Sequence, residues 1–165
     1  MNFLCALFRS FFLLISLLVV VPHSSAGNAG ISVVLVERGD HLITSVINYS
    51  NEPRFVNSRL LVGDVRSGAD VEFTFTRLSD GKVFPLTTRV QVWPLGDSSE
   101  YSLQPLRSFG RSLEICRLAS MYSLDSGVYA VSAGYSPDLR YRPAEKEVSV
   151  ISNAVQVEID LGRCG

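Results

Sequence analysis

The sequence has almost no net charge and only two histidines. The 15 Lys and Arg residues nearly balance the 16 Asp and Glu residues, so the net charge is −1, and no basic cluster stands out along the chain. A surface with so little net charge creates no long-range field that would attract a polyanion or an anionic membrane. We therefore do not expect the protein to bind nucleic acid.

Residue patterns typical of catalytic and metal sites are also missing. His41 has no nucleophile or carboxylate partner at a recognisable spacing, so we expect a solvated or capping role for it. Without residues 1–26, which we expect to be a cleaved signal peptide, one histidine and two cysteines that are expected to pair remain, and these cannot complete a zinc site. Calcium loops, phosphate-binding glycine motifs and Gly-x-Ser-x-Gly turns are absent. We expect no cofactor, metal or catalytic residue, and an enzyme is the least favoured function.

The first 26 residues have the pattern of a secretory signal peptide. Arg9 precedes the apolar run 11–21, and Ser24-Ser25-Ala26 supplies the small residues of a cleavage site. The run is about half of the roughly 20 residues that span a bilayer, so an uncleaved anchor is the weaker alternative. We expect cleavage after Ala26 and a single domain over 27–165 without stable membrane insertion. It would be periplasmic or extracellular in a bacterium and secreted in a eukaryote.

Three cysteines are present, and Cys5 would leave with the signal peptide. An even pair in an oxidising compartment usually forms a disulfide, so we predict that Cys116 pairs with Cys164. The alternative is two separate thiols, with Cys116 buried as a small apolar residue and Cys164 free on a frayed tail.

Short runs of β-branched and alternating residues predict an antiparallel β protein. The clearest is 71–78, where Val71, Phe73 and Phe75 alternate with polar residues, and the Asp80-Gly81 pair after it favours a hairpin turn. We expect loops at 94–106 and 136–147 and one helical turn within 119–124. Strands are expected at 31–36, 41–49, 54–62, 71–78, 83–86, 88–93, 112–118, 127–135, 148–151 and 154–159.

The segment Leu124 to Val131 contains the run Asp125-x-Gly127-x-Tyr129. This run resembles the entry to strand F of immunoglobulin-like domains, where it builds a tyrosine corner. The resemblance implies that the Tyr129 hydroxyl bonds to upstream backbone, that Gly127 permits a close approach, and that all three residues are structural. Val131 stands where antibody domains carry the inter-sheet cysteine. The implied fold is an all-β, immunoglobulin-like antiparallel two-sheet sandwich of about seven to nine strands.

Such a frame carries many functions, including adhesins, inhibitors and assembly chaperones. Because catalytic groups are missing, we expect a non-catalytic exported binding or assembly module whose partner is another protein or a surface glycan. The alternative is an inhibitor of an extracellular enzyme such as a protease, which would insert one exposed loop into its target. Long loops in compact domains are usually functional or disordered, and 94–110 and 136–147 are the candidates.

Individual side chains leave further alternatives open. Arg140-Tyr141-Arg142 places an aromatic ring between two cations, which suits a contact residue, although a solvated loop is the simpler interpretation. Asn48-Tyr49-Ser50 has the form of an N-glycosylation acceptor and can equally be a chance occurrence in a turn. Several aromatics could form a stacking platform or simply cap the core: Trp93, Tyr101, Phe109, Tyr135 and Tyr141.

Overall fold

The computed structural model describes residues 30–87, 100–137 and 150–164. Within these ranges the chain is all-β, as predicted, with antiparallel sheets, one short α-helix and 3-10 turns. Ten strands are assigned there, whereas the immunoglobulin-like resemblance implied about seven to nine. The predicted signal peptide over 1–26 and the predicted strand over 88–93 lie outside the described residues.

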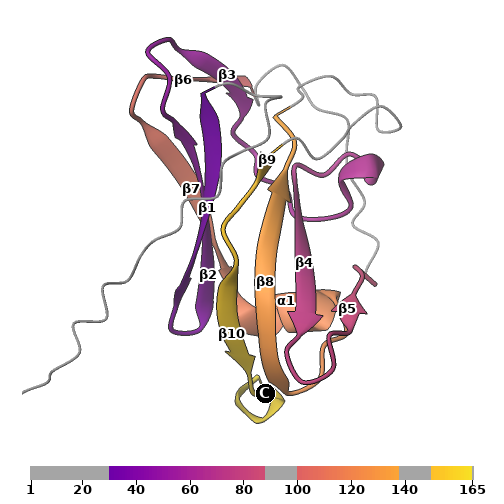
Figure 1. The fold of residues 1–165 in the computed structure, drawn as a ribbon. Helices are drawn as coiled ribbons and strands as arrows, with labels where there is room; N and C mark the ends of the chain where they lie inside the picture. The colour runs from indigo at the N-terminus through magenta and orange to yellow at the C-terminus, as the bar shows by residue number, and fades with distance from the viewer. Residues whose placement is uncertain (1–29, 88–99, 138–149, 165) are drawn as a thin grey trace, which may run out of the picture.

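The first sheet has three antiparallel strands, whose turn and burial follow from the sequence (Figure 1). A tight turn at Gly39 joins the first two, and its φ of +64° suits a residue without a Cβ. Alternate residues such as Val33, Leu35 and Leu42 are buried, as a sheet with one face on the core requires. The order is β1 (Ile31–Arg38), β2 (His41–Asn48) and β7 (Ser108–Glu114).

The second sheet is also antiparallel and is centred on the longest strand, β8. Its alternating residues Phe73 and Phe75 on β4 and Val131 on β8 are buried, as their period-two pattern predicted. Its strands are β10 (Val155–Ile159), β8 (Gly127–Tyr135), β4 (Val71–Arg77) and β5 (Val83–Phe84) in that order, with β9 (Val150–Ile151) also paired to β8.

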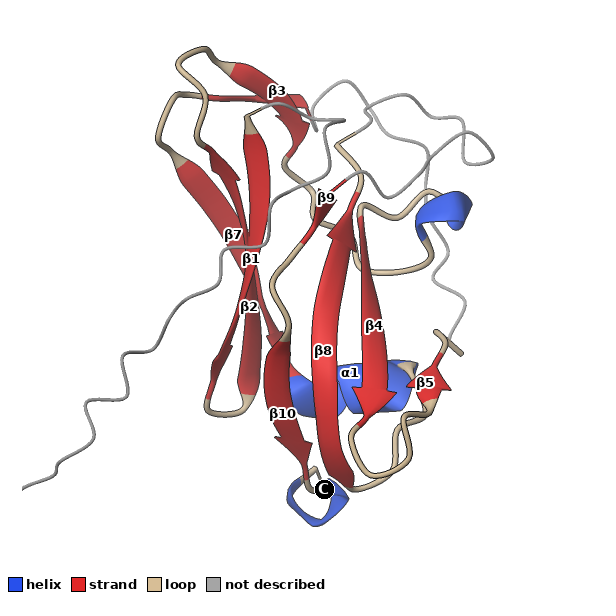
Figure 2. Cartoon of the chain, viewed as in Figure 1, coloured by secondary structure: helices blue, strands red, loops and turns tan. Residues whose placement is uncertain are grey.

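A separate two-stranded ribbon lies at one end of the molecule (Figures 1 and 2). It pairs β3 (Arg54–Asn57) with β6 (Glu100–Leu103). Two expectations were wrong here. The strand expected over 54–62 ends at Asn57, where side-chain bonds to Asp70 turn the chain away. The loop expected over 94–106 contains β6, in which Leu103 is fully buried opposite Arg54, whereas Tyr101, opposite the buried Val56, stays 48% exposed.

The strand expected over 112–118 is wrong in its second half. β7 ends at Glu114, and helix α1 (Ile115–Met121) begins at the next residue. Ile115, Leu118 and Ala119 are all buried and follow the i, i+3, i+4 spacing of one helix face. In Figure 2 this helix lies crosswise to the strands of the second sheet. The helical turn expected within 119–124 is thus the end of a longer helix.

The predicted disulfide between Cys116 and Cys164 is present, with their Cα atoms 5.3 Å apart. It links α1 to the tail that follows the 3-10 turn Leu161–Arg163. In the chain-entropy model, a bridge closing a loop of this size stabilises a fold by about 4 kcal/mol. The alternative of two free thiols is therefore excluded.

Buried side chains of both sheets belong to one hydrophobic cluster, which includes Leu35, Val46, Phe73 and Val131. Asn153, between β9 and β10, ties the edge of the first sheet to the second. Its Nδ2 donates to the Leu35 carbonyl oxygen and its Oδ1 accepts from the Leu35 N–H, both at 2.9 Å. These two bonds satisfy backbone groups that an edge strand would otherwise leave unpaired.

The helices of the described residues are all too short, or too polar, to cross a bilayer.

Candidate functional site

Asn48, the last residue of β2, organises the end of the molecule at which β3 and β6 lie. Its side chain is fully buried, and its Nδ2 donates to the carbonyl oxygens of Glu52 and Leu103, both at 2.8 Å. Its Oδ1 accepts from the Ser50 N–H at 2.9 Å and from the Ser50 hydroxyl at 2.7 Å. All four hydrogen-bonding positions of the amide are used. A sugar on Nδ2 would displace these bonds, so the glycosylation alternative is disfavoured.

The connection between β6 and β7 is a tight turn with a leucine at its tip. The Arg107 N–H donates to the Gln104 carbonyl oxygen at 3.2 Å, Pro105 takes the second position, and Leu106 takes the third with a φ of +57°. This is the pattern of a type II turn, whose third position favours glycine or asparagine. A left-handed backbone costs a residue with a Cβ roughly 1–2 kcal/mol.

Backbone hydrogen bonds hold this turn against β2. The Leu106 N–H donates to the Asn48 carbonyl oxygen at 2.8 Å, and the Asn48 N–H donates to the Arg107 carbonyl oxygen at 3.0 Å. The bonds lie on both sides of the tip, so the turn is anchored where it enters and where it leaves. Leu106 is consequently presented in one fixed position.

Four large side chains are exposed on the elements at this end of the molecule, and together they are called the apical surface: Tyr49, Phe55, Tyr101 and Leu106. Their exposed fractions are 47%, 63%, 48% and 81%. Tyr49 follows β2, Phe55 and Tyr101 lie on the paired strands β3 and β6, and Leu106 is the turn tip. The Tyr101 ring packs edge-on against that of Phe109, with centroids 5.8 Å apart. Exposed apolar side chains gathered at one end are typical of a binding surface.

A buried charged network fixes the other end of β3. The Asp70 carboxylate is fully buried, and its two oxygens accept from Arg59 Nη2 at 2.9 Å and Arg59 Nε at 3.0 Å. The same oxygens also accept from Asn57 Nδ2 and from the Leu61 N–H, both at 2.9 Å. Because the charge is paired and hydrogen-bonded on both oxygens, we assign these residues a structural role.

The residues of the immunoglobulin-like run lie at the opposite end of the molecule. The Tyr129 hydroxyl donates to the Asp125 carbonyl oxygen at 2.9 Å, which is the upstream bond that the resemblance implies. The implied role of Gly127 is wrong. A Cβ there would lie 3.6 Å from Tyr129 Cε2, an ordinary van der Waals contact, so no close approach demands glycine.

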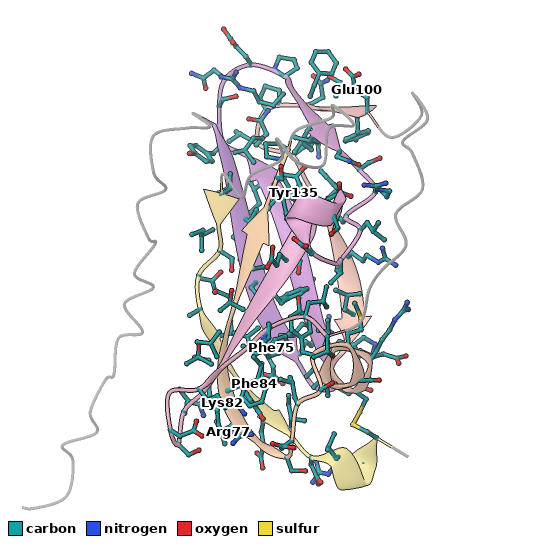
Figure 3. The ribbon with its side chains drawn as sticks, turned by 90° about the vertical axis from the view of Figure 1, so that its right-hand side faces the viewer. Phe75, Arg77, Lys82, Phe84, Glu100 and Tyr135 are labelled. Carbon is teal, nitrogen blue, oxygen red and sulfur yellow. A yellow bond between two sulfur atoms is a disulfide. The ribbon has the colours of Figure 1, made fainter. Side chains whose placement is uncertain are left out.

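Positive charges at this opposite end are matched by rings and carboxylates. Figure 3 shows Arg77, Lys82 and Phe84 together, far from Glu100 on β6. The Arg77 guanidinium and the Lys82 ammonium each lie 4.8 Å from the Phe84 ring centroid. Arg77 also donates to the Asp125 carboxylate at 2.6 Å and to Asp80 at 3.3 Å. This cluster stabilises the β4–β5 hairpin, and it leaves the apical surface as the stronger binding candidate.

Comparison with known proteins assigns no family. No family profile and no curated protein sequence matches the chain. Function is therefore inferred from the side chains themselves.

Groups that could support catalysis do not gather in the described ranges. His41 Nδ1 lies 2.5 Å from Asp40 Oδ1 in an exposed turn, and this hydrogen bond lowers the pKa of the Asp40 carboxyl group. Across residues 30–87, 100–137 and 150–164, no three His, Cys, Asp or Glu side chains are grouped so that they could hold a metal ion. Burial raises the pKa of Tyr122 and of Tyr135, so both hydroxyl groups stay protonated.

The remaining residues that the sequence suggested for binding fall into three groups: outside the described residues, buried, or packed together near the surface. Arg140, Tyr141 and Arg142, proposed as a partner-binding loop, and Trp93 lie outside the described residues. Tyr135 is fully buried and cannot belong to an aromatic platform. Tyr101 and Phe109 do pack together, at the apical surface.

Sequence reasoning missed the central residue of the apical surface, Leu106. A leucine beside a proline carries no mark of exposure, because leucine is usually buried. The available signal was Pro105 followed by Leu106 between two strands, in a position where a turn usually needs glycine or asparagine.

Proposed function

We propose that the protein is a non-catalytic, exported binding module on an immunoglobulin-like two-sheet sandwich, and that its apical surface recognises another protein. The observation that carries the proposal is Leu106. It is 81% exposed at the tip of a rigid turn, in a backbone conformation that leucine disfavours. Glycine there would relieve the strain and remove an exposed apolar side chain. A residue unfavourable on both grounds is better explained by binding than by folding.

The energetic scale agrees with a role as an anchor. Burying a leucine side chain against a partner contributes about 1.5–3 kcal/mol, which exceeds the backbone strain of roughly 1–2 kcal/mol. Because the turn is already fixed by its bonds to Asn48, little further ordering is needed on binding. Phe55 pairs with Ser102 and Tyr101 pairs with Val56, so these two rings point to opposite faces of the β3–β6 ribbon. Tyr49 and one of the two rings would supply the apolar contact area beside the anchor.

Two features support the immunoglobulin-like scaffold. Both antiparallel sheets contribute to one core, with Asn153 closing the side between β1 and β10. The Tyr129 hydroxyl bonds to backbone four residues upstream, as in a tyrosine corner. The disulfide between Cys116 and Cys164 supports an exported location, since such bonds persist in oxidising compartments.

An inhibitor of an extracellular enzyme is the second candidate. A turn anchored on both sides, with one apolar side chain protruding from it, suits insertion into an enzyme cleft, and it lies within the 94–110 segment expected to do this. The two candidates share the same surface and differ in the partner.

The test is affinity capture from native secretions with wild-type protein, Leu106→Gly and Leu78→Ala. Glycine favours the positive φ, so Leu106→Gly should fold at least as stably while it removes the anchor. Leu78 is 52% exposed at the other end and provides the control. We expect Leu106→Gly to recover the partner about tenfold less well, because tenfold corresponds to 1.4 kcal/mol of lost burial.

The outcomes separate the candidates. Equal capture by wild type and Leu106→Gly, or no specific capture by wild type, would contradict the proposal. A captured enzyme that wild type inhibits and Leu106→Gly does not inhibit would favour the inhibitor.

A further inference from the structure

The outer face of the first sheet is built from aliphatic and small residues, independently of the apical surface. On β1 and β2 the side chains Val34, Val36, Ile43 and Ile47 point away from the core. Their strand neighbours are buried, except Glu37 after Val36, which is exposed. Val36 and Ile43 lie directly opposite one another in the register. Val36 is 46% exposed. A strand that is apolar on both faces is typically covered on both faces.

Charge is missing from the middle of this face. Arg38, His41 and Glu114 lie side by side across one end of the sheet, and Tyr49 follows β2 at the other end. Between these two ends, none of the described residues of β1, β2 and β7 points a charged side chain outward. The outer face of the second sheet differs, because it carries Glu72 on β4 and Glu158 on β10. The two faces therefore have different chemistry, and the first is suited to burial. We call it the uncharged face.

Both edge strands of this sheet are blocked from pairing with a strand of another chain, so a partner would have to pack on the face of the sheet. The Leu35 backbone on the β1 edge is bonded to Asn153. On the β7 edge, Arg111 lies opposite the buried Thr44 and so is on the core side of the sheet, where its exposed side chain reaches the Leu60 carbonyl oxygen at 3.4 Å. An inward-pointing charge is a device by which edge strands avoid pairing with another chain.

The uncharged face has a high side and a low side. Val34 and Val36 rise from β1, whereas β7 presents only Ser108, Gly110 and Ser112. Gly110 is required by the fold, since a Cβ would lie 2.7 Å from the Thr44 carbonyl oxygen. A two-fold axis parallel to the strands would place the valines of one copy over the small residues of the other. The face is thus complementary to itself in shape, and without charge it does not repel its own copy.

We propose that a second copy of this chain packs on the uncharged face, sheet against sheet, to form a two-fold dimer with β2 facing β2. The flat area of this face is roughly 400 Å² per copy, since it has three strands spaced about 4.8 Å apart and each strand is about eight residues long at about 3.3 Å per residue. Stable complexes bury about 800 Å² per partner. The dimer is therefore weak and depends on protein concentration.

The test is sedimentation velocity from about 1 μM to about 1 mM protein, a range that brackets weak dissociation constants. Because the axis runs along β2, residue 43 of one copy faces residue 43 of the other. Ile43→Lys and Ile43→Glu should each be monomeric throughout, whereas an equal mixture of the two should sediment as a heterodimer. Thr74→Lys, on the exposed outer face of β4, is the control and should dimerise like wild type.

Wild type that stays monomeric over the whole range would overturn the proposal. So would association of either single Ile43 variant, a monomeric mixture, or loss of association in Thr74→Lys. If circular dichroism shows that the Ile43 variants do not fold, Val36→Lys replaces them, because the same axis places Val36 over Ser112 of the other copy, and its loss of association is then the required result. None of these variants touches Leu106, so failure here leaves the apical surface to its own test.

Discussion

Replacing Asn48 by aspartate exchanges one NH₂ group for oxygen at the most highly bonded side chain of the apical end. The new carboxylate could still accept from Ser50, but it could not donate to the carbonyl oxygens of Glu52 and Leu103. Two buried hydrogen bonds would be lost, and a negative charge would face two carbonyl oxygens without a cation.

The size of the effect follows from the bonds that are lost. Each hydrogen bond contributes about 1 kcal/mol net, and a buried acceptor left unsatisfied costs about 1–3 kcal/mol. We expect Asn48→Ala to lower the free energy of unfolding by about 2–4 kcal/mol and Asn48→Asp by more at neutral pH, because burying an unpaired charge adds to the loss. Asn51→Asp, at an exposed neighbouring position, should change it by less than about 0.5 kcal/mol.

Urea unfolding at a series of pH values provides the assay. Burial raises the pKa of the new carboxyl group in the folded state above its ordinary value of about 3.9. The folded state then binds the proton more tightly, so the penalty is smallest below that ordinary value and grows as pH rises through the folded-state pKa. A free energy of unfolding within 1 kcal/mol of wild type, or the same pH dependence as Asn51→Asp, would refute the reasoning about Asn48.

Three further predictions concern positions away from the apical surface. Tyr129→Phe should lower the free energy of unfolding by about 1 kcal/mol, because the hydrogen bond to the Asp125 carbonyl oxygen is lost. Tyr129→Ala should lower it by about 3–5 kcal/mol, because a cavity is left in the core. Variants that melt at the same temperature as wild type would contradict this. Gly110→Ala should destabilise by about 1–3 kcal/mol, whereas Gly127→Ala, where a Cβ fits, should have little effect in the same thermal unfolding assay. His41→Ala should move the pKa of Asp40 up toward its ordinary value, as carboxyl titration by NMR can show, because the hydrogen bond that lowers it is removed.

Local pattern in the sequence was sufficient for much of the fold. The strands near 31–36, 41–49, 71–78 and 127–135 were predicted because each alternates or is rich in β-branched residues, and burial on one face of a sheet enforces that pattern. The Cys116–Cys164 pair followed from counting cysteines in a chain expected to be exported. Both inferences need no knowledge of distant neighbours.

Helix α1 shows where local pattern failed. Leu113 and Ile115 alternate like a strand, but from Ile115 onward the spacing of buried residues is helical. Over so few residues the two periods cannot be told apart. Packing against the core, through Leu118 and Tyr122, decided between them.

The apical surface was decided by tertiary structure alone. Asn48 matches a glycosylation motif in sequence, and only the fold brings Glu52 and Leu103 to its amide and so buries it. Leu106 is one of many leucines in the sequence, and its exposure results from hydrogen bonds that hold its turn against β2. Residue type and period along the sequence determined that the chain would fold as β-strands around one core, because apolar residues that alternate with polar ones are buried on one face of a sheet. Which large side chains remained outside depended on contacts between segments far apart along the chain.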